Sequence, residues 1–185
     1  MKRHPQLLKR EKTALLVIDV QQKILPVIHE WETVVNNTLK LINGFKVMNI
    51  SIYYTEQYPK GLGGTESRIK EALSEAKFFE KMTFSCFGAG SLFEEFKRTG
   101  IEQVVVCGIE SHVCVQQTVL DLLANGFQVN LAADAVSSRR KFDYGSALNR
   151  MRNNGAEVTV TESILFELLN VCGTDEFKAV SKLVK

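Results

Sequence analysis

Three residues far apart in the chain have the side-chain types needed for nucleophilic catalysis by a thiol. Asp19 ends the apolar run ALLVID, Lys81 follows the apolar pair Phe78–Phe79, and Cys114 comes shortly after the run QVVVCG. A carboxylate can accept a thiol proton and return it to a leaving group, while a lysine stabilises nearby negative charge. Each residue alone has an ordinary explanation as a turn cap, a solvated charge or a small core side chain. Their shared position after apolar runs favours the catalytic interpretation.

Cys114 is the strongest single candidate because a helix is predicted to begin beside it. Unpaired N–H groups and the helix dipole favour an anion at a helix N-terminus, so we expect a lowered thiol pKa there. The same N–H groups can bind the oxyanion that forms when a thiolate attacks a carbonyl. His112 invites a Cys–His pair, but a spacing of two at a helix start does not readily bring the imidazole onto the thiol. Asp19 is therefore the preferred base.

The elements that must position these residues alternate between short apolar runs and helical patterns. Strands are expected at Ala14–Asp19, Ile50–Thr55, Lys77–Lys81, Gln103–Gly108, Gln128–Ala133 and Glu157–Val160. Helices are expected at Thr33–Met48, Glu66–Glu75, Ser91–Thr99, Val113–Asn125, Phe142–Asn153 and from Thr161 onward. This alternation predicts a doubly wound α/β fold with a six-stranded, mainly parallel sheet. Ligands of such sheets lie beyond the carboxyl ends of the strands, where the three candidates are found.

Composition narrows the class of protein. At 185 residues, with 45% apolar and 24% charged residues, we expect one globular domain over residues 13–185 after a solvated N-terminal arm of residues 1–12. The 23 Lys and Arg are scattered and nearly balanced by 21 Asp and Glu, which argues against a nucleic-acid partner. No apolar run is long enough for a membrane span. The four cysteines lack metal-ligand spacing, so we expect them to be free thiols and the protein to be cytoplasmic.

Four segments, taken together and in order, resemble the isochorismatase-like cysteine hydrolases. They are LLVIDVQ around Asp19, FEKMTFSCF around Lys81, GIESHVCVQQT around Cys114, and DAVSSR followed by ALNRMRNNGAEVTVTES. The resemblance runs from about Thr13 to the C-terminus, and YYTEQYPKGLG is similar to the subgroup of isochorismatase domain-containing proteins. It implies a Rossmann-like, three-layer α/β/α fold and assembly into dimers or larger homo-oligomers.

The resemblance also implies roles for individual residues. Asp19, Lys81 and Cys114 would form a catalytic triad, and the Ile109–Glu110 peptide bond would be cis. The oxyanion hole would consist of the backbone N–H groups of Glu110 and Cys114. Enzymes that cleave isochorismate carry no cysteine at the nucleophile position, so Cys114 favours the branch that hydrolyses amides or carbamoyl groups.

Nicotinamidases of that branch bind a metal ion after the second strand. The corresponding segment here, TEQYPKGLGGTES, has no histidine, so neither a metal ion nor another cofactor is expected. Tyr58 and Phe84, near two strand ends, are predicted to form walls of the substrate pocket.

The leading hypothesis is thus a hydrolase that acts on a small amide or related acyl compound through a Cys114 acyl-enzyme. Two alternatives stay open on the same fold. One is an oligomeric binding or scaffold protein with weak catalysis. The other is a redox-sensing thiol protein, in which Cys114 is oxidised and Cys86 resolves it.

Overall fold

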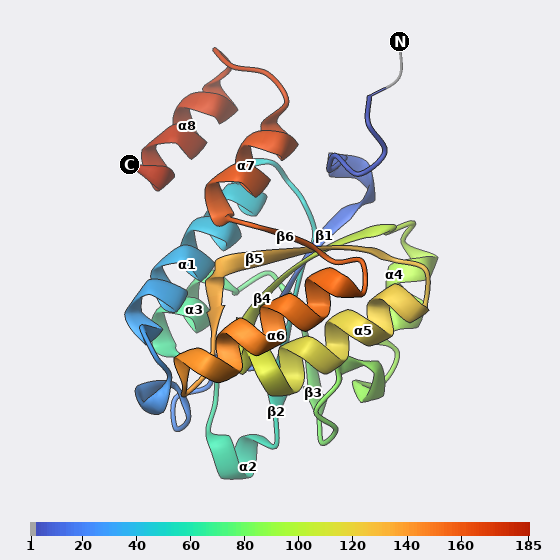
Figure 1. The fold of residues 1–185 in the computed structure, drawn as a ribbon. Coiled ribbons are helices and arrows are strands. Elements are labelled where there is room, and N and C mark those ends of the chain that lie inside the picture. The colour runs from blue at the N-terminus through green and yellow to red at the C-terminus, as the bar shows by residue number, and fades with distance from the viewer. Residues whose placement is uncertain (1–2) are drawn as a thin grey trace.

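A six-stranded parallel sheet forms the middle layer of the molecule, as Figure 1 shows for the computed structural model, which describes residues 3–185. Its order is β3-β2-β1-β4-β5-β6, and every neighbouring pair of strands runs parallel. The bounds are β1 Thr13–Ile18, β2 Ile52–Gln57, β3 Lys77–Lys81, β4 Gln103–Ile109, β5 Gln128–Ser137 and β6 Glu157–Thr159. The predicted α/β class, strand number and three-layer arrangement are confirmed.

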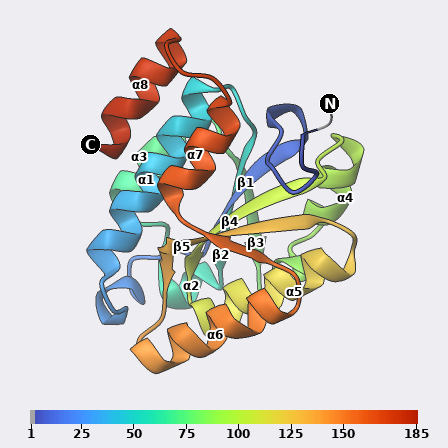
Figure 2. The ribbon, with the colours of Figure 1, turned by 45° about the horizontal axis from the view of Figure 1, so that its top comes forward.

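Helices cover both faces of the sheet (Figures 1 and 2). One face carries α1 (Trp31–Val47), α3 (Ser67–Ala72), α7 (Thr161–Leu169) and α8 (Asp175–Val184). The other carries α4 (Leu92–Arg98), α5 (Gln116–Ala124) and α6 (Lys141–Asn153). Two apolar cores result, and β1 contributes alternate residues to each because successive strand side chains point to opposite faces. Strands β1 and β4 therefore read as nearly continuous apolar runs and are buried throughout, as expected for strands covered on both sides.

Several local predictions differ from the structure. Two helices have no counterpart among the expected elements: α8, and the short α2 (Pro59–Leu62), which lies in the segment TEQYPKGLGGTES. The helix predicted from Val113 begins instead with a π-helical turn, Ser111–Val115, which continues into α5. Strand β5 extends to Ser137, past an irregularity in its pairing with β4.

The segment before β1 is not the solvated arm that its basic composition predicts. Leu8 is fully buried in the core beside α1 and α7, and the Lys9 N–H donates to the Gln103 side chain at 2.7 Å. Arg10 donates from Nε to the Leu168 carbonyl at 2.7 Å and pairs with Glu176. The prediction is wrong for residues 8–12 because one apolar side chain and one cation find partners that lie distant in sequence. Within residues 3–185, no helix is long and apolar enough to cross a bilayer.

Gly108 allows β1 and β4 to approach each other closely beside the carboxyl edge of the sheet. Its φ is +119°, and a Cβ atom at this position would lie 2.1 Å from the Ile18 carbonyl oxygen. Only glycine fits both conditions. The contact lies one residue before Asp19 and two before Glu110, so it brings together the ends of the two strands that carry these residues.

We expect Gly108→Ala to lower the free energy of unfolding by more than about 3 kcal/mol, because it adds a backbone clash to a strained φ. Gly126→Ala is the matched control. Its φ is +85°, but a Cβ atom there would meet no atom within 4 Å, so only the conformational cost of about 1 kcal/mol applies. Urea unfolding followed by circular dichroism measures both. Equal losses in the two variants would contradict the close approach.

Candidate active site

The three candidate catalytic residues meet at the carboxyl edge of the sheet. Strand order reverses between β1 and β4, and Asp19 and Cys114 follow these two strands. Lys81 ends β3, two strands away from β1, and its long side chain reaches back to Asp19. This edge is where open parallel sheets bind their ligands.

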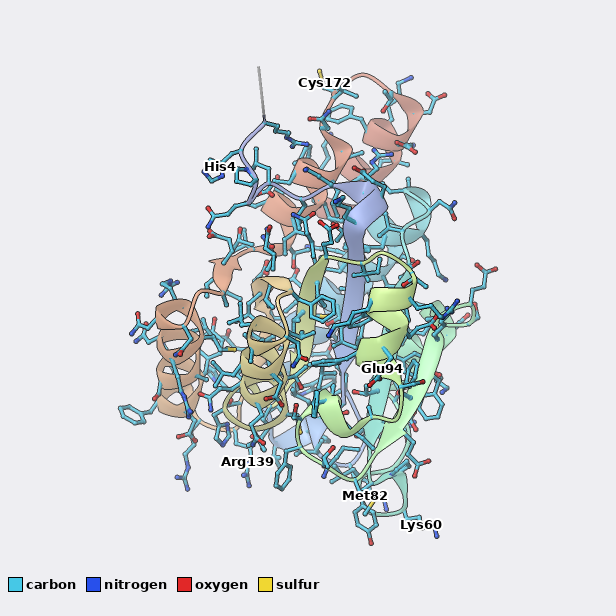
Figure 3. All side chains as sticks on the ribbon, turned by 90° about the vertical axis from the view of Figure 1, so that its right-hand side faces the viewer. His4, Lys60, Met82, Glu94, Arg139 and Cys172 are labelled. Carbon is cyan, nitrogen blue, oxygen red and sulfur yellow. The ribbon has the colours of Figure 1, made fainter. Side chains whose placement is uncertain are left out.

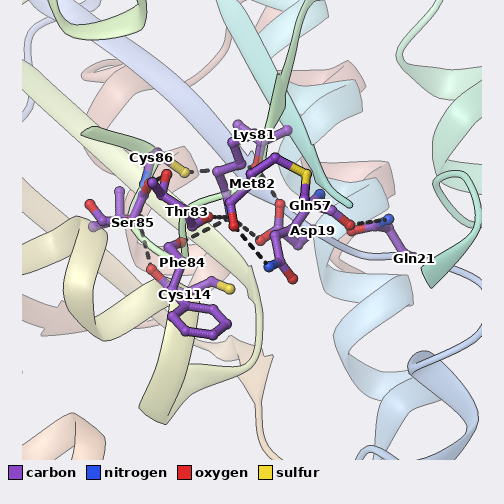
Figure 4. Close-up of polar contacts among 12 residues, drawn as sticks. Asp19, Gln21, Gln57, Lys81, Met82, Thr83, Phe84, Ser85, Cys86 and Cys114 are labelled. Atoms are coloured by element: carbon purple, nitrogen blue, oxygen red, sulfur yellow. Dashed lines mark hydrogen bonds and ion pairs between the residues drawn. The ribbon is translucent and has the colours of Figure 1, made fainter. Parts of the chain in front are cut away.

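Asp19 and Lys81 form a buried ion pair. Lys81 Nζ lies 2.5 Å from Asp19 Oδ2, with side-chain exposures of 0% and 4%. The ammonium also donates to the carbonyl oxygens of Thr83 at 3.2 Å and Phe84 at 2.9 Å, as Figure 4 shows, so each of its three protons has an acceptor. The other carboxylate oxygen of Asp19 accepts a hydrogen bond of 2.7 Å from the Thr55 hydroxyl.

The charge of Lys81 is set by two opposing effects. Burial, the largest single cause, lowers the pKa of the ammonium, but the negative charge of Asp19 and its hydrogen bond to Lys81 raise it. The net result is a pKa above the ordinary value, so Lys81 is a permanent cation in the site.

An unusual backbone conformation at Asp19 directs its side chain toward the site. Its φ is 51°, in the left-handed region that Asp tolerates better than most residues. Its N–H still donates to the Thr55 carbonyl at 3.2 Å, which continues the ladder between β1 and β2 by one residue. Its carbonyl accepts the Gln21 N–H at 2.7 Å, closing a tight turn after the strand. The side chain therefore leaves the sheet where the apolar strand ends.

Cys114 lies in the π-helical turn and opens onto the same cavity as Asp19. Burial, followed by the negative charge of Asp19, raises the pKa of its thiol well above the ordinary value, although Lys81 opposes this. The lowered pKa predicted from a helix N-terminus is therefore wrong. Regular α-helix begins only at Gln116, and a carboxylate is close to the sulfur.

The cavity that Asp19 and Cys114 share has a volume of about 310 Å³. Its walls are largely apolar, and Phe84 is one of them, at the position that the sequence suggested. Tyr58 does not line this cavity. It is half-exposed, and its ring packs over Gly61 in the turn that begins α2. The full lining is Asp19, Ile24, Gln57, Leu62, Phe84, Ile109, Glu110, Val113, Cys114 and Arg139.

An ion pair at one wall of the cavity was missed by the sequence interpretation. Arg139 donates to the Glu110 carboxylate from its backbone N–H and from Nε, both at 3.1 Å. The Glu110 side chain is buried, whereas that of Arg139 is 57% exposed. In Figure 3 Arg139 lies at the same end of the molecule as Met82, opposite Cys172. Arg139 follows β5, and Gln57 ends β2. Both could have been found by extending the search to every residue at the carboxyl end of a strand.

The peptide bond between Ile109 and Glu110, where the family resemblance implies a cis bond, is cis in the structure. Glu110 separates β4 from the turn that contains Cys114. The Glu110 carbonyl accepts the N–H groups of Val113 at 3.0 Å and Val115 at 3.2 Å. These two bonds fold the chain tightly around the sulfur.

The remaining thiols and His112 occupy other environments. His112 Nδ1 contacts the Ser138 hydroxyl at 2.9 Å, so that side chain has a partner of its own. Burial raises the pKa of Cys107 to about 12, and that of Cys86, which lies close to the site, also to about 12. Cys172 is exposed. In the part of the chain that the structure describes, no three His, Cys, Asp or Glu side chains are grouped to hold a metal ion.

A model of the isochorismatase domain matches residues 13–163 of the chain. The secreted isochorismatase effector Isc1 of Phytophthora sojae is 40% identical over 182 residues, which cover 94% of this chain and 84% of that protein. A structure described as the MAR1 ribonuclease of Caenorhabditis elegans superposes with a TM-score of 0.90 at 35% identity, covering 96% of this chain and 91% of that one. The YcaC gene product of Escherichia coli, described as an octameric hydrolase of unknown specificity, has a TM-score of 0.90 at 23% identity, covering 99% and 91%.

The last of these likenesses shows the fold alone, but the domain match and the 40% identical relative show the family. The motifs around Asp19, Lys81 and Cys114 all lie inside the matched region. The chain belongs to the isochorismatase family and has its hydrolase fold.

Proposed function

We propose that this protein hydrolyses a small amide or a related acyl compound through a thioester on Cys114, with Asp19 as the base and Lys81 as its electrostatic partner. The observation that carries the proposal is a cavity onto which Cys114 opens together with Asp19, the carboxylate of the buried Asp19–Lys81 pair. Burying two charges costs free energy, and a purely structural role does not require a buried ion pair.

In the resting enzyme Cys114 is a neutral thiol, because burial and Asp19 raise its pKa. The thiol proton passes to the Asp19 carboxylate as the sulfur attacks the substrate carbonyl carbon. Negative charge then moves from Asp19 to the carbonyl oxygen, while Lys81 stays positive. The backbone N–H groups of Glu110 and Cys114 are assigned to bind that oxyanion.

Collapse of the tetrahedral intermediate breaks the C–N bond and leaves the acyl group on Cys114. The proton held by Asp19 goes to the departing nitrogen, so the amine leaves neutral. Water then attacks the thioester carbonyl and gives a proton to Asp19. When the carbon–sulfur bond breaks, that proton returns to the sulfur and the acid product is released. The cycle needs no redox partner.

The cavity supports a small substrate. Its apolar walls suit a short carbon skeleton, and Gln57, Glu110 and Arg139 add polar groups to the lining. The related protein from Caenorhabditis elegans is called a ribonuclease. The near balance of 23 basic and 21 acidic residues does not favour a polyanionic substrate for this chain, and RNA is therefore a control substrate in the test below.

Assembly and location remain proposals as well. The Escherichia coli neighbour is described as octameric and the Phytophthora relative as secreted. We propose a homo-oligomer of at least two copies. A cytoplasmic location is proposed from the four cysteines, none of which forms a disulfide.

We expect the protein to release ammonia or an amine from at least one member of a panel of small primary amides and N-carbamoyl compounds. Cys114→Ser and Asp19→Asn should each lower kcat by at least about 10³-fold, since Cys114 carries the acyl group and Asp19 takes part in every proton transfer. The exposed Cys172 allows a matched control, Cys172→Ser, which should keep full activity. Mass spectrometry should detect the acyl group on Cys114. Cleavage of RNA that survives Cys114→Ser, with no amide hydrolysed, would contradict the proposal.

The raised pKa of Cys114 predicts how its labelling depends on pH. Iodoacetamide reacts with the thiolate, so the midpoint of the rate–pH profile should lie above the free-cysteine value of about 8.5. Asp19→Asn removes the negative charge that disfavours the thiolate, so it should shift the midpoint down and speed labelling at pH 8. Labelling of Cys172 in the same sample is the internal reference. A wild-type midpoint below that of free cysteine would restore the prediction made from the helix N-terminus.

Cys86→Ser separates hydrolysis from redox sensing. A resolving thiol must ionise to attack, but burial keeps the pKa of Cys86 near 12. We expect Cys86→Ser to hydrolyse amides with kcat within about threefold of wild type, because serine keeps a donor for the Thr55 hydroxyl. Cys107→Ser, at a buried thiol further along the chain, is the matched control. Hydrolysis absent from all forms, with a Cys86–Cys114 disulfide after peroxide treatment, would favour the redox hypothesis.

A further inference from the structure

The loop of residues 82–88, here called the backing loop, supports the Asp19–Lys81 pair from behind. Its carbonyl oxygens at Thr83 and Phe84 accept two of the three ammonium protons of Lys81. The direction of the third proton, toward Asp19, therefore depends on where this loop lies (Figure 4).

The backing loop also contacts the second partner of Asp19. The single hydroxyl proton of Thr55 is donated to Asp19 Oδ1. The contact of 3.8 Å between the Thr55 oxygen and Cys86 Sγ must then use the thiol proton. Cys86 stays protonated because of its burial, so this weak donor is always present. Both oxygens of Asp19 are thus held by groups that the backing loop supports.

Helix α5, which continues from the turn of Cys114, holds the backing loop by two side chains. The Ser85 hydroxyl donates to Asp121 Oδ2 at 2.5 Å, and the Cys86 N–H donates to the Thr118 hydroxyl at 2.9 Å. The Thr118 hydroxyl in turn donates to the carbonyl oxygen of Cys114 at 2.7 Å. A continuous chain of hydrogen bonds therefore joins the nucleophile to the carboxylate and the ammonium.

Polar contacts are important for holding the backing loop in place, because several of its apolar side chains are exposed and contribute little burial. Met82, Phe84 and Phe87 are 67%, 52% and 56% exposed. A segment with few buried apolar contacts opens at low free-energy cost unless other bonds hold it. Ser85 is central, since its hydroxyl also accepts the Phe87 N–H at 3.1 Å and its carbonyl accepts the Thr83 hydroxyl at 2.8 Å.

We propose that Asp121 and Ser85 are a positioning pair that sets the relative placement of Cys114 and the Asp19–Lys81 pair. The pair lies outside the cavity lining and touches no reacting atom. Its effect on turnover rests on the proposed hydrolase function, but its effect on the backing loop does not. Asp121 acts through Ser85, the loop carbonyls and Lys81, in that order.

The test uses the full chain with Asp121→Ala, Ser85→Ala, the double variant and the conservative Asp121→Asn. Alanine is a good helix former, so Asp121→Ala should keep α5 intact. We expect kcat to fall roughly tenfold in both single variants, the scale of small displacements at a catalytic site. The double variant should lose no more than either single one, because the two residues form one interaction. Asp121→Asn should recover part of kcat.

Two further measurements separate positioning from simple destabilisation. Hydrogen exchange at the amides of Cys86 and Phe87 should speed up in Asp121→Ala, while exchange in the strands stays unchanged. The rate–pH profile of Cys114 labelling should shift, since the charges beside the thiol move. Asp175→Ala in α8, which removes a surface carboxylate paired with Lys178, is the matched control and should change none of these readouts.

Unchanged exchange and labelling in Asp121→Ala would overturn the positioning pair whether or not amides are hydrolysed. So would a double variant whose loss is the product of the two single losses. If no amide is a substrate but exchange and labelling change as expected, the positioning pair stands and only the hydrolase proposal fails.

Discussion

The ion pair between Asp19 and Lys81 is the interaction on which the rest of the site depends. Moving both charges away from water carries a penalty of several kcal/mol per ion, recovered only when the geometry is good and every proton and lone pair has a partner. Here Thr55 and two loop carbonyls complete that set. Strands β1, β2 and β3 and the backing loop must therefore all be in place for the pair to be tolerated. Loss of one charge would leave the other buried and uncompensated.

The same pair helps to explain why the thiolate form of Cys114 is disfavoured. A carboxylate beside a buried sulfur disfavours the thiolate, and Lys81 only partly compensates because its charge is already engaged by Asp19. This arrangement suits a thiol that gives up its proton only while it attacks a carbonyl. It also limits reaction with oxidants and adventitious electrophiles, which need the thiolate. In the proposed mechanism, one carboxylate thus both protects the thiol at rest and activates it during attack.

Apolar runs and the residues that end them were enough to predict the sheet, the edge that carries the site and the places of Asp19, Lys81 and Cys114. These features depend on local pattern and on the rule that parallel strands end together. The pKa of Cys114 could not be predicted, because it depends first on the burial of the thiol and then on a carboxylate 95 positions away in the sequence. The burial of Leu8 likewise depends on α7, and the wall formed by Arg139 depends on the buried carboxylate of Glu110. These contacts join residues that are distant in the sequence, so a local sequence pattern does not reveal them.

The order of the strands has a consequence for how the active site comes into being. Strand β1 is translated early, yet it pairs with β4, whose residues follow more than 80 positions later. A growing chain that has just completed β3 contains Asp19 and Lys81, but it lacks both the backing loop that completes their set of partners and Cys114. Cys114 is the last of the three to be translated, and the α5 side chains that hold the backing loop follow it. Chains that end before residue 114 therefore contain both charged residues without the sulfur, and under the proposed mechanism they cannot form the thioester.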